Sequence, residues 1–166
     1  MFRTLSFLML IVIYAACSKD ESSTPSPSFK FSANGNNYQW EGDQIAKVFT
    51  TGAANDTCYY LTAHDSSFNS IGLRFNTNKI ALGTYTLTRS ITSTAYSPEH
   101  SFRLGNASWG SIQAGDFATV TITKIHDGFF VDGTFSARMD CMAGSSCTAS
   151  IVISNGEFKN LPFFPF

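Results

Sequence analysis

Hydrophobic and polar residues alternate with a period of two along most of the chain after residue 28. Such alternation predicts β-strands with one buried and one exposed face. An Asn34-Gly35 pair separates the first two alternating runs, and glycine accepts the positive φ that a tight hairpin turn requires. The residues on the predicted inward faces of this part are Phe29, Phe31, Tyr38, Trp40, Tyr59, Leu61, Ala63, Ile71, Leu73, Phe75, Tyr85, Leu87, Phe102 and Leu104.

The alternation is clearest in the C-terminal third, where a turn is predicted at Asp127-Gly128. Residues 161–166 are apolar but include two prolines, which cannot donate to a strand ladder. We therefore expect this tail to lie over the edge of the core and not to form a central strand. The predicted inward residues of this part are Val120, Ile122, Phe129, Val131, Gly133, Phe135, Ala137, Met139, Ala149, Ile151 and Ile153.

Residues 29–166 are predicted to form one all-β domain. The pattern contains about eight to ten short strands with turns every 8–12 residues, as in antiparallel sandwiches. We expect a single antiparallel β-sandwich, with a small β-barrel as the alternative. The chain of 166 residues is long enough for one domain with a substantial core.

The N-terminal sixteen residues have the features of a secretory signal. Arg3 precedes an apolar run from Leu5 to Ala16, which is shorter than the ~20 residues of a membrane-spanning helix. Tyr14-Ala15-Ala16-Cys17 resembles the lipobox of bacterial lipoproteins, with Tyr14 where a Leu, Val or Ile is usual. The resemblance implies that residues 1–16 are removed and that Cys17 is acylated. The alternative is an ordinary signal followed by a chance cysteine.

The residues after Cys17 predict a tether. Residues 18–21, Ser-Lys-Asp-Glu, are similar to the surface-export signal of Bacteroidota lipoproteins, the alternative being a plain solvated linker. Residues 22–28 are Ser, Thr and Pro and have no apolar side chain to bury, so residues 17–28 are predicted to be a flexible segment. The resemblance implies a lipid-anchored protein of the outer membrane that faces the cell exterior.

Five further segments occur in a recognisable order: residues 31–40, 83–87, 121–124, 131–136 and 154–158. Together they resemble a family of small Bacteroidota lipoproteins that carry a domain of unknown function. This resemblance implies an all-β surface lipoprotein, and it carries over no activity and no site residues.

Three cysteines remain if Cys17 carries lipid, and disulfides persist in an exported protein. Cys141 continues the predicted inward face of one strand, and Cys147 begins that of the next. Opposed residues on antiparallel strands lie within disulfide range, so we expect Cys141 and Cys147 to be bonded and Cys58 to be left over. Pairing of Cys58 with either of them stays open as an alternative.

No spacing in the sequence predicts a catalytic set, a metal site or a cofactor site. His64, His100 and His126 each stand beside a carboxylate, but neighbours in a strand point to opposite faces, and we expect all three to be polar loop residues. The cysteines have no histidine at zinc-ligand spacing. A net charge of -1 gives no electrostatic reason to bind nucleic acid.

The aromatic residues suggest a ligand. Trp109 lies between glycines and small polar residues, in what the sequence predicts to be a loop, with Asn106 nearby. An exposed tryptophan can stack on a sugar ring while asparagine donates hydrogen bonds, so Trp109 and Asn106 are candidate carbohydrate-binding residues. The interpretation that we favour is that Trp109 fills part of the core.

These observations favour a non-catalytic binding or envelope-structural domain, held at the membrane through Cys17. The alternative is a surface hydrolase on a jelly-roll scaffold that acts on a polymer such as a glycan.

Overall fold

The computed structural model describes residues 26–41, 46–51, 58–77, 79–88, 100–126 and 129–164. The predicted signal peptide, Cys17, most of the tether and the predicted Asp127-Gly128 turn lie outside these residues. Pro27 is buried and the first strand begins at Ser28, so the last residues of the predicted tether already belong to the domain.

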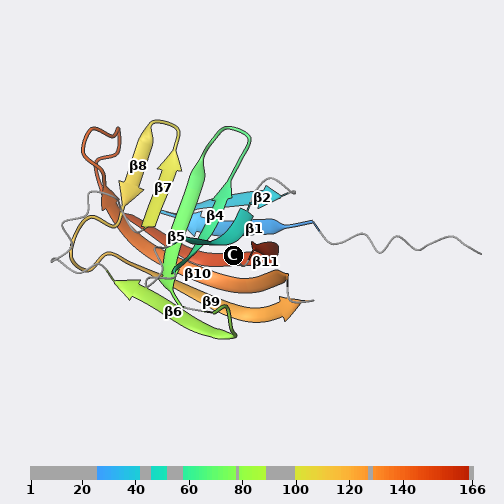
Figure 1. Ribbon diagram of the computed structural model, residues 1–166. Coiled ribbons are helices and arrows are strands. Elements are labelled where there is room, and N and C mark those ends of the chain that lie inside the picture. Colours follow the sequence, from blue (N-terminus) through green and yellow to red (C-terminus); the bar gives the residue numbers. More distant parts are fainter. Residues whose placement is uncertain are drawn as a thin grey trace, which may run out of the picture.

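The described residues form eleven strands and no helix, which confirms the all-β fold class (Figure 1). No helix in these ranges is long and apolar enough to cross a membrane. The strands are β1 (Ser28–Ala33), β2 (Asn36–Glu41), β3 (Ala46–Thr51), β4 (Cys58–His64), β5 (Ser70–Asn76), β6 (Gly83–Thr88), β7 (His100–Leu104), β8 (Ala107–Gly110), β9 (Phe117–His126), β10 (Phe130–Cys141) and β11 (Ile151–Phe164).

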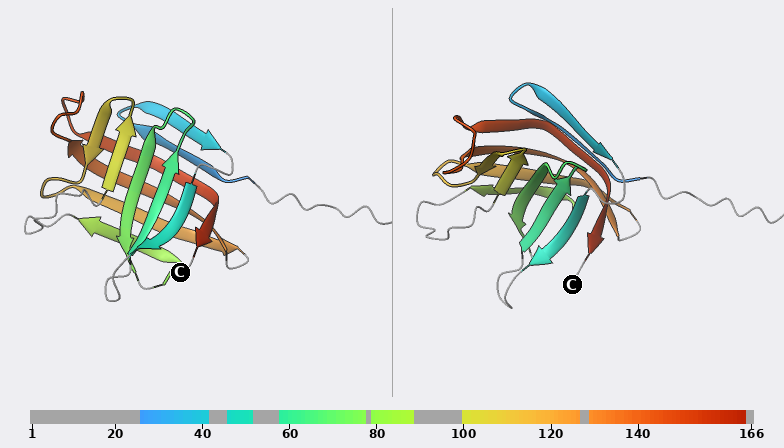
Figure 2. Two further views of the ribbon diagram at one scale, coloured as in Figure 1. Left: turned by 45° about the horizontal axis from the view of Figure 1, so that its top comes forward. Right: turned by 90° about the horizontal axis from the view of Figure 1, so that it is seen from above.

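The strands lie in two layers that are joined along both sides. A six-stranded layer has the order β2-β1-β11-β10-β9-β6, and a five-stranded layer has the order β3-β4-β5-β7-β8. Figure 2 shows the five-stranded layer crossing the six-stranded one. The end of β11 pairs with β3, and the end of β10 pairs with β8. The strongly curled sheet therefore combines features of the predicted sandwich and of the alternative barrel.

Most pairs are antiparallel, as predicted, and β11 with β3 is a short parallel pair. The predicted Asn34-Gly35 hairpin is confirmed: both residues have positive φ, 47° and 85°, and they connect β1 to β2. Positive φ at both central residues matches the right-handed twist of the strands that the turn joins.

The core lies between the two layers, and the inward faces follow the sequence pattern closely. Along β10, Val131, Phe135, Ala137 and Met139 are all buried. Phe129 and Ala149 are exceptions: Phe129 precedes β10 and 62% of its surface is exposed, and Ala149 is exposed in the loop before β11. Large side chains from both layers are fully buried, among them Phe29, Phe75, Phe102, Phe158, Leu61, Leu73 and Leu161.

The expectation for the C-terminal tail is wrong. Residues 161–164 continue β11, opposite Val131 and Phe130 of β10. The Phe163 N–H donates to the Phe129 carbonyl oxygen at 2.7 Å. Because successive N–H groups point to opposite edges of a strand, the position of Pro162 faces the other edge. At that edge, β1 pairs with β11 only as far as Lys159, and β3 pairs with β11 only from Phe163 onward. The missing N–H of Pro162 therefore breaks no ladder hydrogen bond.

Two residues with left-handed backbone bend β11 along its length. Asn155 has φ 51° and Asn160 has φ 52°. The Asn160 N–H donates to the Asp132 carboxylate at 2.8 Å, which holds the second bend against β10. Asparagine tolerates this conformation better than most residues. The bends allow β11 to pair with β1 and β10 in one layer and with β3 in the other.

Candidate functional site

The predicted disulfide is present. The sulfurs of Cys141 and Cys147 are bonded, with the Cα atoms 5.7 Å apart, which excludes the alternative pairings of either with Cys58. Cys58 lies buried at the start of β4. The expected placement is wrong in two respects: Cys147 lies in the loop before β11, and both bonded cysteines are half-buried.

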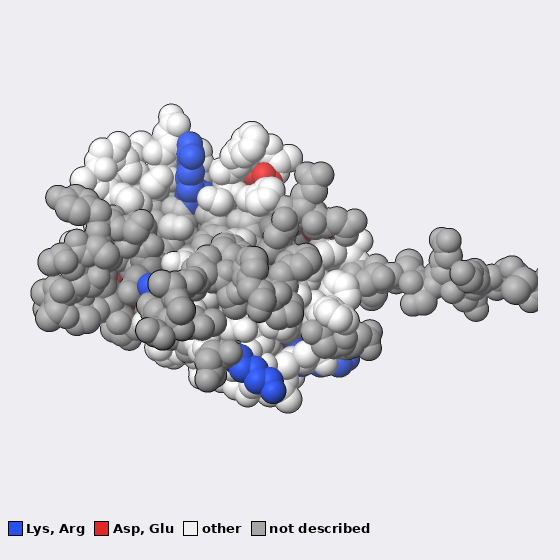
Figure 3. Space-filling view, in the orientation of Figure 1, with Lys and Arg blue, Asp and Glu red and all other residues white. Residues whose placement is uncertain are grey.

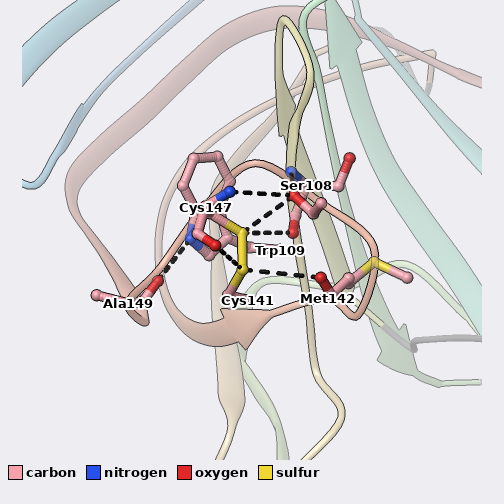
Figure 4. Close-up of a disulfide and its surroundings, with 7 residues drawn as sticks. Ser108, Trp109, Cys141, Met142, Cys147 and Ala149 are labelled. Atoms are coloured by element: carbon pink, nitrogen blue, oxygen red, sulfur yellow. Dashed lines mark hydrogen bonds between the residues drawn. A yellow bond between two sulfur atoms is a disulfide. The ribbon is translucent and has the colours of Figure 1, made fainter.

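The disulfide ties the loop of residues 142–150 to the end of β10, beside β8, as Figure 4 shows. The Met142 N–H donates to the Ser108 carbonyl oxygen at 3.0 Å, and the Ser108 N–H donates to the Ser145 hydroxyl at 2.6 Å. The Cys147 sulfur lies 3.1 Å from the same Ser108 oxygen. Backbone hydrogen bonds and the cross-link together join the two layers at this corner.

Trp109 belongs to this corner, in β8, so the expected loop context is wrong. Its indole N–H donates to the Ala149 carbonyl oxygen at 2.9 Å. Its ring stacks on Phe102, with the centroids 5.4 Å apart. Trp109 is half-buried against the core, whereas Asn106 is exposed in the turn between β7 and β8. A ligand role for the pair stays a prediction.

Replacing Trp109 should show how much this corner depends on the ring. We expect Trp109→Ala to cost about 3 kcal/mol of unfolding free energy, because it removes the stack on Phe102. Trp109→Phe keeps an aromatic ring and loses only the hydrogen bond to Ala149, so it should cost about 1 kcal/mol. Urea unfolding followed by circular dichroism measures both. Equal costs for the two variants would contradict the packing role.

His100 is buried in β7, so the expectation of a loop residue is wrong for it. The backbone N–H of Arg74 donates to the His100 Nδ1 at 3.1 Å. The His100 Nε2 is therefore the donor to the Leu87 carbonyl oxygen at 3.2 Å. Its own backbone N–H donates to the Ser111 hydroxyl at 3.0 Å. Burial lowers the pKa of His100 to about 4, so the ring is neutral and joins β5, β6 and β7.

The other two histidines also lie in strands, His64 at the end of β4 and His126 at the end of β9. The His126 Nε2 is 2.7 Å from the carboxylate of Asp132, across the hairpin and not next to it in sequence. The acidic partner of His126 in the structure is therefore Asp132, which is not its neighbour in the sequence.

Two acidic side chains, those of Asp65 and Asp116, hold turns. Asp65 accepts the N–H groups of Ser67 and Asn69 at 2.8 and 3.0 Å. Asp116 is buried and accepts those of Ile112 and Gln113 at 2.9 and 3.0 Å. Among the described residues, no group of three or more His, Cys, Asp or Glu is placed to hold a metal ion. Charged side chains are scattered over the face seen in Figure 3.

Two hollows lie on the outer side of the six-stranded layer, and Asn155 lines both. One of about 440 Å³ lies over β9, β10 and β11, and one of about 630 Å³ lies over β1 and β2. The first is lined by Thr119, Thr121, Thr134, Phe135, Ser136, Asn155, Gly156 and Glu157, and the second by Lys30, Phe31, Ser32, Asn37, Tyr38, Gln39 and Asn155. These residues were not predicted as a site, because outward-facing polar positions in strands are common.

No protein-family model, no curated protein and no solved structure matches this chain. Its function is therefore inferred from its own residues.

Proposed function

We propose that this protein is a lipid-anchored lipoprotein of the bacterial outer membrane, exposed to the cell exterior, whose β-domain is non-catalytic and serves binding or envelope structure. The observation that carries the proposal is Cys17, placed directly after a short apolar leader that ends Ala15-Ala16. A diacylated cysteine supplies two hydrocarbon chains, which is the number that stable anchoring requires.

The Cys141–Cys147 disulfide supports export of the chain. Disulfides persist in oxidising compartments and are rare in the reducing bacterial cytoplasm. The bond closes a short ring, and the loop-entropy relation assigns such a ring about 2 kcal/mol of stability.

The start of β1 supports a tethered domain. Ser28 opens the strand and Pro27 before it is buried, and residues 18–26 between Pro27 and Cys17 are polar except for one proline. Fully extended, that segment spans at most about 30 Å. An anchor at Cys17 would therefore keep the domain close to the membrane while leaving its layers exposed to solvent.

The placement of the carboxylates supports binding over hydrolysis. Asp65 and Asp116 each accept two backbone N–H groups, and Asp132 accepts that of Asn160. These acids therefore have structural tasks in turns and bends. A hydrolase of the kind considered as the alternative needs two carboxylates that face one substrate bond.

We expect Cys17→Ala to move the protein from the membrane fraction to the soluble fraction and to abolish labelling with a fatty acid. The reason is that the thiol is the proposed point of acylation. Cell fractionation with a radiolabelled or alkyne-bearing fatty acid measures both effects. Ser23→Ala, in the same tether, is the matched control and should remain in the membrane. An unlabelled parent protein, or a Cys17→Ala variant still in the membrane, would contradict the proposal.

A further inference from the structure

We infer that the two hollows beside Asn155 form one binding site for an uncharged oligosaccharide. This inference rests on the proposed binding function and gives it a ligand class and a location. It places the site on the outer side of the six-stranded layer, away from the corner that contains Trp109.

The site depends on a bulge in β11. On one side, β10 pairs Phe135 with Gly156 and then Ala137 with Ile153. On the other side, β1 pairs Lys30 with Glu157 and then Ser32 with Ser154. Asn155 is skipped by both neighbouring strands and is exposed. A bulge of this kind re-aims one side chain out of the regular ladder, and here it places the amide between the hollows.

Gly156 keeps the bulge closed. A Cβ at this position would lie 2.5 Å from the Phe135 carbonyl oxygen, so only glycine lets β10 approach this closely. With φ 51°, Asn155 adopts a backbone conformation that few side chains adopt. Asn155 must adopt a positive φ and Gly156 must lack a Cβ, and these two consecutive residues lie where the hollows adjoin.

Apart from Lys30 and Glu157, the polar side chains around Asn155 carry hydroxyl or amide groups. Thr134 and Ser136 line the first hollow, and Asn37 and Gln39 line the second. Each hydroxyl has one donor and two acceptor positions, and each amide has two of each. Such a lining complements a ligand that carries both donors and acceptors along its length, which describes the hydroxyl groups of a sugar chain.

One carboxylate, Glu157, and one ammonium group, Lys30, line the two hollows, and these two opposite charges pair with each other. The Glu157 carboxylate is bonded to the ammonium groups of Lys30 and, at 2.9 Å, Lys159. These hydrogen bonds hold the pKa of Glu157 below its ordinary value, so the pairs persist at neutral pH. An uncharged ligand therefore fits the site better than a polyanion or a polycation.

The extent of the two hollows favours a chain over a single sugar. Their linings come from five neighbouring strands, β9, β10, β11, β1 and β2. Four strand spacings of about 4.8 Å give a length of about 19 Å across the layer. Only an extended ligand that crosses the strands can contact both hollows at once.

The test uses the whole mature protein on an array of neutral and acidic glycans. Asn155→Gly removes the amide and accommodates the positive φ, so the bulge should keep its shape. Asn160→Gly is the matched control, because it changes the same residue type at nearly the same φ in the same strand, outside both hollows. We expect Asn155→Gly to weaken binding of a neutral glycan at least tenfold and Asn160→Gly to leave it unchanged.

A second pair of variants leaves the bulge intact. Thr134→Val removes one hydroxyl from the first hollow at constant volume, and Thr123→Val does the same at an exposed position of β9 outside it. We expect weaker binding only for Thr134→Val, with melting temperatures within a few degrees of the parent.

Three results would overturn the inference: no neutral glycan bound, binding confined to charged glycans, or binding lost in Asn106→Ala but retained in Asn155→Gly. The last result would place the ligand at the corner with Trp109. Each of these outcomes is separate from membrane attachment, which fractionation of Cys17→Ala tests without any ligand.

Discussion

Replacing Gly133 with alanine is expected to destabilise the domain by about 3 kcal/mol or to prevent its folding. A Cβ at this position would lie 2.0 Å from the Thr121 carbonyl oxygen and 2.4 Å from the ring of Phe158. Gly133 pairs with β9 on one side and with β11 on the other, so neither neighbouring backbone can move away without breaking a ladder. Urea unfolding of the purified variant measures the loss.

Gly72→Ala is the matched control in a strand of the other layer. Its Cβ would meet only the Ser101 hydroxyl at 3.2 Å, and that side chain can rotate away. We expect a change below about 1 kcal/mol, because alanine also loses less backbone entropy than glycine on folding. A Gly133→Ala variant as stable as Gly72→Ala would show that β9, β10 and β11 are less tightly packed than the structure describes.

The second large effect is the dependence of stability on pH that His100 imposes. The pKa of His100 falls from 6.5 to about 4 in the folded protein, chiefly because burial disfavours the charged ring. Between these values the unfolded chain binds the proton and the folded chain does not, so stability falls as the pH falls. The shift corresponds to about 3 kcal/mol, lost between pH 6.5 and pH 4 and fully present above that window.

Protonation also removes an acceptor. The Nδ1 atom that accepts the Arg74 backbone N–H would carry a proton, and that part-buried N–H would lose this hydrogen bond. His100→Leu should therefore be less stable at pH 7 and should lack the slope between pH 6.5 and pH 4. His64→Leu, at an exposed position, should keep the slope. Urea unfolding across this pH range measures both, and a parent protein without the slope would contradict the neutral buried ring.

The period-two pattern predicts the inward faces well because alternation is a local property of each strand. It does not show where a strand ends, and this is why Phe129 is exposed although it has the same parity as Val131. His100 has the same parity as Phe102, so its burial could have been found from the pattern. The adjacency of each histidine to an acid in the sequence carries no information on burial, because neighbours in a strand point to opposite faces.

Features that depend on two neighbouring strands are harder to predict from sequence. Asn155-Gly156 has the residues of a turn, yet pairing continues on both sides of it, and the result is a bulge. Proline is rare in central strands because it lacks an N–H, yet Pro162 lies in β11. Its position falls between the pairing with β1 and the pairing with β3, where no N–H is needed. The Cys141–Cys147 pair was predictable because the parity of the two neighbouring strands places the two residues close to each other.

The position of β11 has a consequence for the order in which the domain can fold. This strand follows all the other described strands in the chain, and it pairs with β1, β10 and β3. Until it has been synthesised, β1 lacks its ladder to the rest of the six-stranded layer, and β3 and β10 each lack one neighbour. The contacts between β1 and β11 span most of the domain, and such long-range pairing makes folding slow. The chain should thus complete its tertiary structure only after its C-terminal strand is available, and a nascent chain that ends before β11 should remain sensitive to proteases.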